Sequence, residues 1–411
     1  MTHEVFARQR LKHSVQLRRE RADASDPALR YVGLEHVGSG TGKLLPVTDE
    51  TFNDKPAQDE GETASTSTRF ASGDVLFGKL RPYLAKAFLA DFPGRCSAEL
   101  LVMRPTAFES GFLRYVCLWR DFLDEVDAST FGSKMPRADW ESVGNVFVPV
   151  PDMPVQRAIA DYLDRETARL DALVAAKERA LSLLIEKKKA VTSRVVTRGC
   201  DESAPTRESG VDWLGLIPGH WDTRRVSWLF RERDERCEPD LPLLEVSLNT
   251  GVALREFSSD RIEGTAADFN TYKVARRGDI VFNKMRMWQG AVGVAPQDGL
   301  VSPDYVVAAP TGPLTSAFAG LLFRTGMFSA ECCRRSRGIV WDRLRLYWDD
   351  FREIVLPLPS MEEQDEIVYN VAARFARIDA LVGATERSIA LIKERRSALI
   401  SAAVTGALKI A

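Results

Sequence analysis

The chain has 411 residues, of which 45% are hydrophobic and 28% are charged, and its formal net charge is −2. This length and composition predict about two to four globular domains, and no stretch approaches the roughly 18 consecutive apolar residues of a membrane span. The Arg-rich N-terminus lacks the apolar core of a secretory signal, and the six cysteines form no CxxC pair, so we expect a cytoplasmic protein without a membrane partner, a disulfide framework or a zinc site.

Residues 1 to about 150 predict a mixed α/β domain. The segment Tyr31–Val37 alternates like a strand and runs into the glycine cluster Gly38–Lys43. A phosphate-binding loop needs Gly-x4-Gly-Lys followed by Ser or Thr, but Val37 stands five residues before Gly42 and Leu44 follows the lysine. We therefore interpret the glycine cluster as a turn.

Two basic segments follow in the same domain. Residues Gly73–Arg81 predict a turn that leads into a buried strand, and this strand emerges with Lys79 and Arg81. Residues Gly132–Arg137 predict a basic turn. A short strand is then expected at Asn145–Pro151, where prolines end it before a long helix begins.

The long helix is predicted from Pro154 to Gly199, and its sequence occurs twice. Arg169–Val174 returns as Arg377–Val382, 208 positions later. Apolar residues recur every seven positions in both copies, as in the seam of a coiled coil. They are Leu163, Leu170, Leu184, Val191, Val174, Leu181 and Val195 in the first copy, and Val371, Ile378, Ile392, Leu399, Val382, Ile389 and Ala403 in the second. We therefore expect the two helices to pair with each other.

Signals for helix ends accompany both copies. Ser360 and Glu363 predict a capping box, and Asp152 occupies the equivalent position before the first helix. Gly199 and Gly406 stand where a glycine would end each helix. About 42 residues at about 1.5 Å each predict a helix about 60 Å long, far longer than an average globular helix.

The second half of the chain repeats the landmarks of the first. Gly278–Arg286 follows Gly73–Arg81 by 205 positions, and Gly338 and Arg343 follow Gly132 and Arg137 by 206, while the intervening sequences differ. We therefore predict an α+β protein with two pseudo-repeated mixed α/β globules, each followed by a long helix, and the two helices pair as an antiparallel coiled coil. The expected boundaries are 1–152 and 200–359 for the globules and 153–199 and 360–408 for the helices.

No catalytic or metal site is apparent in the sequence. The chain has four histidines and neither an HExxH nor a GxSxG motif, and we interpret matched carboxylates such as Glu99 and Asp304 as structural hydrogen-bond acceptors. We therefore expect a non-catalytic binder that has no cofactor of its own. Two alternatives stay open: a coiled-coil scaffold with two protein-binding globules, and an enzyme with a convergent cluster of titratable groups.

Two matched globules on paired helices suggest a reader of two half-sites on double-stranded DNA. Lys and Arg neutralise phosphates, Arg also reads guanine, and Asn or Gln reads adenine. The candidate DNA-binding residues are Lys79, Arg81, Lys134, Arg137, Asn283, Lys284, Arg286, Gln289, Arg337 and Arg343, with Arg334, Arg335 and Arg345 as further basic residues of the second globule. Each alone is more often a solvated surface residue than a base contact, but the set favours DNA.

In these features the chain resembles the specificity subunits of type I restriction–modification systems, over essentially its whole length. The motif Gly-Asp-hydrophobic2-Phe-x-Lys-x-Arg occurs in both globules, and the second globule opens with Trp213-Leu214-Gly215 and Ile217-Pro218-x-x-Trp221. Pro-x-Pro precedes each helix, which then carries Gln-x-x-Ile and Arg-(Leu/Ile)-Asp-Ala-Leu. The first globule departs from the pattern because it lacks the Ile-Pro-x-x-Trp opening.

The resemblance implies that each globule is a target-recognition domain for one half of a bipartite, interrupted DNA sequence. It also implies that the helix pair spaces these domains and docks two methyltransferase subunits, and it leaves open whether two restriction subunits join them. S-adenosylmethionine, ATP and Mg would then belong to the partner subunits. The polar positions that interrupt the helix seam, Lys177, Thr385, Lys188 and Arg396, are candidates for setting the register and for partner contact.

Overall fold

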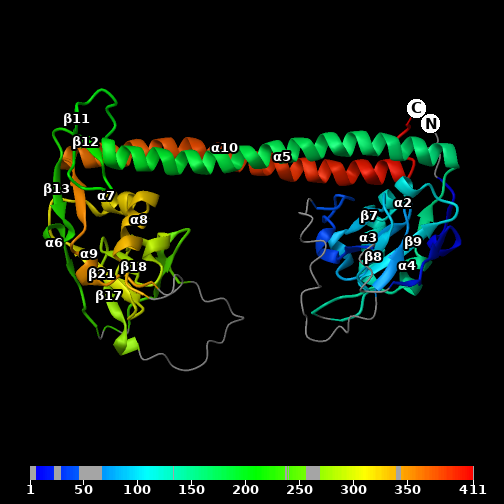
Figure 1. Ribbon diagram of the computed structural model, residues 1–411, viewed down its shortest axis with the longest axis horizontal. Helices are drawn as coiled ribbons and strands as arrows, with labels where there is room; N and C mark the ends of the chain where they lie inside the picture. Colours follow the sequence, from blue (N-terminus) through cyan, green and yellow to red (C-terminus); the bar gives the residue numbers. More distant parts are fainter. Residues whose placement is uncertain are drawn as a thin grey trace. The chain divides into compact units, whose positions relative to one another are not determined.

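The computed structural model describes residues 6–22, 29–45, 67–132, 134–236, 238, 240–255, 269–338 and 344–410. It divides into two compact units, and each unit contains one globule and a stretch of both long helices (Figure 1). The first unit consists of Met1–Glu178 together with Glu386–Ala411, and the second consists of Arg179–Thr385.

The first globule is built on a four-stranded antiparallel sheet in the order β2-β9-β6-β7. These strands are β2 (Val15–Leu17), β9 (Leu100–Pro105), β6 (Val75–Gly78) and β7 (Ala87–Leu89). A second sheet has the order β3-β5-β8-β4, with β3 (Arg21–Ala22), β5 (Ser67–Phe70), β8 (Gly94–Cys96) and β4 (Arg30–Val32). The remaining elements are the ladder of β1 (Arg8–Arg10) with β10 (Phe147–Pro149), the helices α2 (Ser110–Val116), α3 (Arg120–Ala128) and α4 (Trp140–Asn145), and the 3-10 turns η1 (Leu11–His13), η2 (Leu34–His36) and η3 (Pro82–Leu84).

The second globule repeats this sheet in the order β14-β21-β18-β19. Its strands are β14 (Phe230–Glu232), β21 (Tyr305–Pro310), β18 (Ile280–Asn283) and β19 (Val292–Val294). Among the described residues it is accompanied by two-stranded ladders: β11 (Thr206–Glu208) with β12 (Leu216–Pro218), β13 (Asp222–Arg225) with β22 (Val355–Leu358), β15 (Leu244–Ser247) with β16 (Gly251–Leu254), and β17 (Lys273–Ala275) with β20 (Gly299–Val301). Its helices are α6 (Val226–Leu229), α7 (Ser316–Phe323), α8 (Gly326–Arg335) and α9 (Trp348–Phe351), with the 3-10 turns η4 (Phe269–Thr271) and η5 (Met287–Gln289).

The buried strand predicted in each globule is confirmed, and it has a core on both of its faces. In β6, Val75 and Phe77 belong to a large core shared with α2 and α3, whereas Leu76 belongs to a smaller one. In β18, Ile280 and Val281 divide in the same way between two cores. Successive side chains of a strand point to opposite faces, so a continuous apolar run is what a strand covered on both faces requires.

The long helices are α5 (Met153–Arg198) and α10 (Met361–Val404), and within each unit they pair in antiparallel directions. In the first unit, Leu163 near the start of α5 shares a core with Ile400 near the end of α10. In the second unit, Val195 near the end of α5 shares a core with Ile367 near the start of α10. The predicted pairing is therefore confirmed.

The helix ends follow the sequence signals in part. Gly199 and Gly406 follow the two helices with φ angles of +73° and +80°, in the left-handed region that glycine enters without strain. Ser360 Oγ accepts the predicted hydrogen bond from Glu363 N (3.2 Å). The carboxylate of Glu363, however, accepts from the indole of Trp221 (2.8 Å), so only one half of the predicted capping box forms as expected.

The glycine cluster is the turn predicted, whereas the strand predicted before it is too long. Strand β4 ends at Val32, and the chain then bends because His36 Nδ1 accepts a hydrogen bond from Gly33 N (3.0 Å). In the turn, Gly38 N donates to the carbonyl of Lys43 (3.0 Å). Gly40 and Gly42 have φ angles of +68° and +73°.

Candidate nucleic-acid interface

A buried Gly-Asp turn begins the strand that leads to the basic residues of each globule. The Asp74 carboxylate accepts hydrogen bonds from Ala71 N (2.7 Å) and Arg18 Nε (2.9 Å), and its side chain is only 3% exposed. Such a buried charge is stable only when it is paired and hydrogen-bonded. The turn is therefore fixed in place, and so is the start of β6.

The second globule repeats this turn with its own residues. Asp279 accepts from Arg276 N (2.9 Å) and Arg233 Nε (2.7 Å). The pKa of the Arg233 guanidinium is raised, and its hydrogen bond to Asp279 is the largest cause of this shift. In both globules a serine hydroxyl also donates to the glycine carbonyl of the turn, Ser110 to Gly73 (2.8 Å) and Ser316 to Gly278 (2.6 Å).

The structure brings the four candidate residues of the first globule together on two adjacent segments. Ala138 N donates to the carbonyl of Lys79 (2.9 Å), and Arg81 N donates to the carbonyl of Pro136 (2.8 Å). The turn that carries Lys134 therefore lies against the end of β6. Sequence spacing alone did not place these segments side by side.

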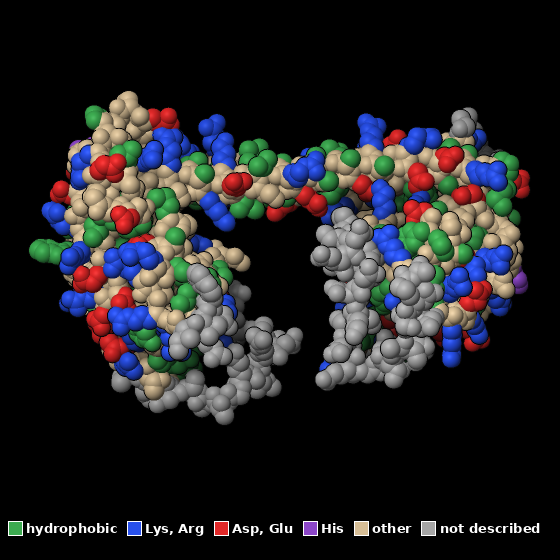
Figure 2. Space-filling view, in the orientation of Figure 1, with side chains coloured by type: hydrophobic (Ala, Val, Ile, Leu, Met, Phe, Trp, Pro, Cys, Tyr) green, Lys and Arg blue, Asp and Glu red, His purple; other side chains and the backbone are tan. Residues whose placement is uncertain are grey.

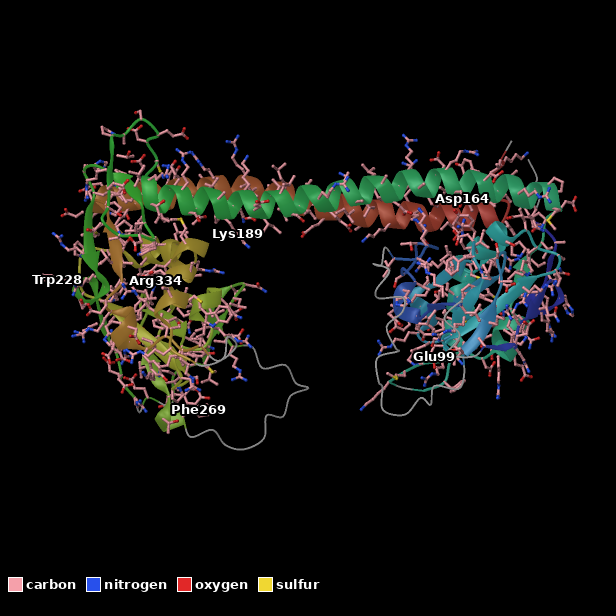
Figure 3. The ribbon with its side chains drawn as sticks, viewed as in Figure 1. Glu99, Asp164, Lys189, Trp228, Phe269 and Arg334 are labelled. Carbon is pink, nitrogen blue, oxygen red and sulfur yellow. The ribbon has the colours of Figure 1, made fainter. Side chains whose placement is uncertain are left out.

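The side chains at this place differ in their availability to a ligand. Arg81 and Lys134 are exposed, whereas Lys79 is half-buried. Arg137 forms an ion pair with Glu99 (3.1 Å) and keeps 40% of its side chain exposed. Glu99 lies in the globule well away from the long helices, as its label shows against that of the helix residue Asp164 (Figure 3). The ion pair of Arg137 with Glu99 therefore lies away from the helix pair of its own unit.

Three exposed apolar side chains accompany these cations, and sequence reasoning missed them. Tyr83, Phe131 and Met135 are 55%, 61% and 52% exposed. Exposed apolar side chains among basic residues suit packing against sugars or insertion between base steps of a duplex. For Phe131 and Met135, the signal that could have found them is their position in a turn that also contains Gly, Lys and Pro.

The backbone of the same region adopts an uncommon conformation. Arg81 and Ala85 have φ angles of +50° and +51°, and they are the described non-glycine residues with positive φ. Such residues cost roughly 1–3 kcal/mol each and cluster at functional sites. They flank η3, which carries Tyr83, so the strained segment coincides with the exposed cations and aromatic side chain.

The equivalent surface of the second globule uses a longer turn. Leu346 N donates to the carbonyl of Lys284 (2.9 Å), as Ala138 N does to Lys79. Arg337 and Arg345 exchange backbone hydrogen bonds (both 2.9 Å) in the way that Phe131 and Arg137 do. Arg345 thus takes the place of Arg137. The sequence pairing of Arg137 with Arg343 is wrong, because the second globule has two more residues between the bridged residues. Arg343 itself lies outside the described residues.

The other candidates of the second globule have varied surroundings. Arg286 and Gln289 are exposed. Asn283 Oδ1 accepts a hydrogen bond from Met285 N (2.9 Å) and Lys284 Nζ approaches the carbonyl of Pro303 (3.5 Å). Arg337 forms an ion pair with Asp350, and this hydrogen bond raises the pKa of Arg337.

Charges of both signs are interspersed on the face of the globules seen in Figure 2, so no single basic field stands out there. Arg334 and Arg335, on the last turn of α8, both pair with the buried carboxylate of Glu331.

Among the described residues, no group of His, Cys, Asp and Glu could hold a metal ion. None of the described helices is long and apolar enough to cross a bilayer.

Comparisons with known proteins identify relatives of one kind, although no family model matches the chain. The chain is 22% identical to the EcoBI type I restriction enzyme specificity subunit of Escherichia coli over 315 residues, which are 70% of this chain and 64% of that subunit. It is 25% identical to the EcoDI specificity subunit of Escherichia coli over 156 residues, 38% of this chain and 33% of that subunit. The matches therefore span less than two thirds of these relatives.

Two solved structures share the fold. A chain from a structure of a type I R-M system aligns with a TM-score of 0.67 and 20% identity, over 98% of this chain and 99% of that one. The HsdS subunit from Thermoanaerobacter tengcongensis aligns with a TM-score of 0.52 and 21% identity, over 98% of each chain. The chain is a homologue of type I specificity subunits.

In this specificity-subunit homologue, the Gln-x-x-Ile motif anchors each globule to its helix. Gln156 is buried, and its amide donates to the carbonyls of Pro151 (2.8 Å) and Ala107 (3.3 Å) while its oxygen accepts from Glu109 N (2.8 Å). These three partners of Gln156 all precede α5 in the chain and belong to the globule. The glutamine therefore fixes the direction in which the globule joins α5.

Gln364 repeats the arrangement at the start of α10 of the homologue. It donates to the carbonyls of Pro313 (2.9 Å) and Pro359 (3.1 Å) and accepts from Thr315 N (2.7 Å). A second motif, Ile-Pro-x-x-Trp, places the buried indole of Trp221 against Glu363 on the same helix. Two of the motifs on which the resemblance rests, Gln-x-x-Ile and Ile-Pro-x-x-Trp, thus lie at the joints between globule and helix.

Proposed function

We propose that this chain is the DNA-recognition subunit of a type I restriction–modification complex and reads a bipartite, interrupted sequence, one half with each globule. The observation that carries the proposal is the repeated basic surface. In both globules a buried Gly-Asp turn fixes a strand whose end, at Lys79 and Lys284, hydrogen-bonds to a second basic segment. Repetition of this surface suits a duplex with two half-sites.

The same comparison supports a division of roles within each surface. Backbone hydrogen bonds that hold the two segments together are repeated, at Lys79 and Lys284, which suits a common framework. Several side chains exposed on the segments are not repeated: Phe131 and Met135 in the first globule, and Gln289 and Arg337 in the second. Different exposed side chains on one framework would read different bases. We infer that the two half-sites differ in sequence.

The proposed partners follow from the same assignment. The helix pair would space the two globules and dock two methyltransferase subunits, which could in turn hold restriction subunits. The chain itself would be non-catalytic, and S-adenosylmethionine, ATP and Mg would be bound by the partners. Leu173, Leu183 and Leu391 are at least 45% exposed on the helices, and exposed apolar side chains of this kind suit a protein interface.

A binding selection tests the proposal. The chain would be purified with its co-expressed methyltransferase, and bound duplexes would be selected from a random pool and sequenced. We expect two short specified blocks separated by a fixed gap. The variants Arg81→Ala and Arg286→Ala should each weaken recognition of one block only. Binding without any enriched motif would contradict DNA reading and favour a scaffold with two protein-binding globules.

A further inference from the structure

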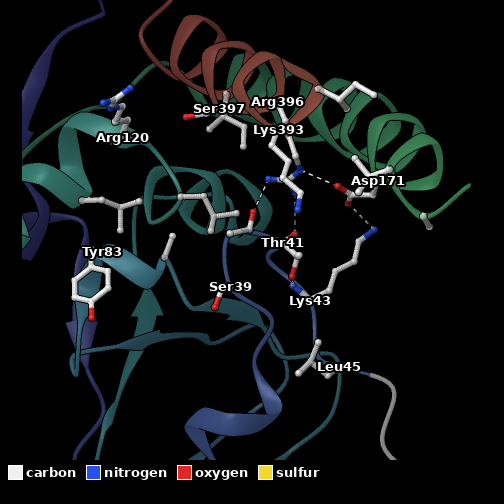
Figure 4. Close-up of a pocket in the computed structure, with 18 of the residues that line it drawn as sticks. Ser39, Thr41, Lys43, Leu45, Tyr83, Arg120, Asp171, Lys393, Arg396 and Ser397 are labelled. Atoms are coloured by element: carbon white, nitrogen blue, oxygen red, sulfur yellow. Dashed lines mark hydrogen bonds and ion pairs between the residues drawn. The ribbon is translucent and has the colours of Figure 1, made fainter. Parts of the chain in front are cut away.

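The first globule is tied to the helix pair by an arginine of the C-terminal helix. Arg396 on α10 donates from Nη1 to the carbonyl of Gly40 (2.5 Å), from Nη2 to the carbonyl of Thr41 (3.0 Å), and from Nε to Asp171 on α5 (2.9 Å). Figure 4 shows this side chain between the glycine turn and both helices. One guanidinium therefore joins three separate elements of the first unit.

These contacts are made by a side chain that solvent hardly reaches. Only 11% of the Arg396 side chain is exposed. Asp171 also lies 3.5 Å from Lys43, the last residue of the glycine turn, so the carboxylate joins the turn a second time. The network lines a cleft of about 770 Å³ between the turn, α3 and the two helices. Where this cleft separates the globule from the helices, the charged network connects them.

Arg396 contacts the globule at a different point along α10 from the apolar contact. The apolar contact between this globule and α10 includes Ile400, Ala403 and Val404. Arg396 stands four residues before Ile400, which is about one helical turn or roughly 6 Å. Without Arg396 the apolar contact and the hydrogen bond of Tyr115 to Asp164 on α5 would remain, but the glycine turn would lose its hydrogen bonds to α10.

The second unit shows what the same position does without an arginine. Lys188 on α5 occupies the position equivalent to Arg396 on α10. Asp379 on α10 is in turn equivalent to Asp171 on α5, and it forms the matching ion pair with Lys188. The ammonium of Lys188 also lies over the ring of Phe375 (4.6 Å). Both of these partners belong to α10. The ion pair between the helices is therefore repeated, while the link to a globule is found at Arg396.

We propose that Arg396 is a positioning residue, which fixes the glycine turn Gly38–Lys43 against the helices and so sets the angle at which the first globule presents its half-site surface. An arginine is required because its planar fork offers donors on three nitrogens. A lysine, with one nitrogen, would keep the ion pair with Asp171 but would lose the hydrogen bonds to the carbonyls of Gly40 and Thr41. The effect of Arg396 on the half-site angle rests on the proposed DNA-reading function. The hydrogen-bonded link between Arg396 and the glycine turn does not.

The experiment compares Arg396→Lys with Arg395→Lys in the full chain bound to its methyltransferase. Arg395 is the exposed neighbour on α10, so the control makes the same chemical change without touching the turn. Two readouts are needed. Hydrogen exchange of the amides in 38–45 reports the link, and methylation of duplexes whose gap is one base pair shorter or longer than the natural gap reports the angle.

We expect Arg396→Lys to speed exchange in 38–45 several-fold and to allow methylation at a changed gap, while Arg395→Lys alters neither. Unchanged exchange in Arg396→Lys would overturn the link. Faster exchange with unchanged gap discrimination would overturn the positioning role. A wild-type complex that methylates no interrupted site would instead refute the proposed function, and the exchange comparison would still decide the link.

Discussion

The buried glutamines at the helix starts allow a quantitative test of how the globules are joined to the helices. Replacing Gln156 by Met keeps the length and apolar volume of the side chain but removes three hydrogen bonds, to Pro151, Ala107 and Glu109. A hydrogen bond contributes about 0.5–1.5 kcal/mol net. We therefore expect Gln156→Met to lower the free energy of unfolding of the first unit by about 2–4 kcal/mol.

The matched variant Gln364→Met removes the equivalent three hydrogen bonds in the second unit. Each variant should act on its own unit, because the two units have separate cores. Native-state hydrogen exchange measures opening free energies segment by segment and can assign each loss to one unit. Losses below about 0.5 kcal/mol in both variants, within the range of ordinary surface substitutions, would refute the assignment of the glutamines as joints.

The remaining predictions concern single contacts in the second unit. Burial would raise the pKa of Glu331, but hydrogen bonds from Arg334 and Arg335 outweigh it and leave the pKa below its ordinary value of 4.5. This stabilisation is present above that pH and lost as the pH falls through the lowered pKa, so Glu331→Gln should flatten the acid limb of a urea-unfolding series. Trp221→Phe removes the indole bond to Glu363 and should cost about 1–3 kcal/mol more than Trp119→Phe, because the buried Trp119 indole has no hydrogen-bond partner; equal losses in urea unfolding would contradict this. If Arg286 contacts a phosphate, Arg286→Ala should reduce the slope of log affinity against log salt by about 1, whereas an unchanged slope would exclude that contact.

The repeated framework could be predicted from the sequence because it depends on short-range patterns. The heptads located the seam, Gly199 and Gly406 located the helix ends, and the apolar runs at Val75 and Ile280 located the central strands. These features follow from local periodicity and backbone preference, which a single sequence displays directly.

The surfaces could be predicted only in part, because they depend on contacts between distant segments. Sequence spacing paired Arg137 with Arg343, whereas the hydrogen bond between Leu346 and Lys284 assigns that place to Arg345. The partner of Glu363 was also missed, since Trp221 is 142 residues away. Arg396 was noted as a polar break in the seam, but its hydrogen bonds to the glycine turn follow from tertiary packing alone.

We propose that one chain reads two half-sites at a fixed separation, and methylation mapping tests this reading most directly. The chain would be co-expressed with its proposed methyltransferase partner, and modified adenines would be located in the host DNA by sequencing. We expect one bipartite motif with two short specified blocks and a constant gap. Modification at a single uninterrupted motif, or no modification by a stable complex of the two proteins, would contradict it.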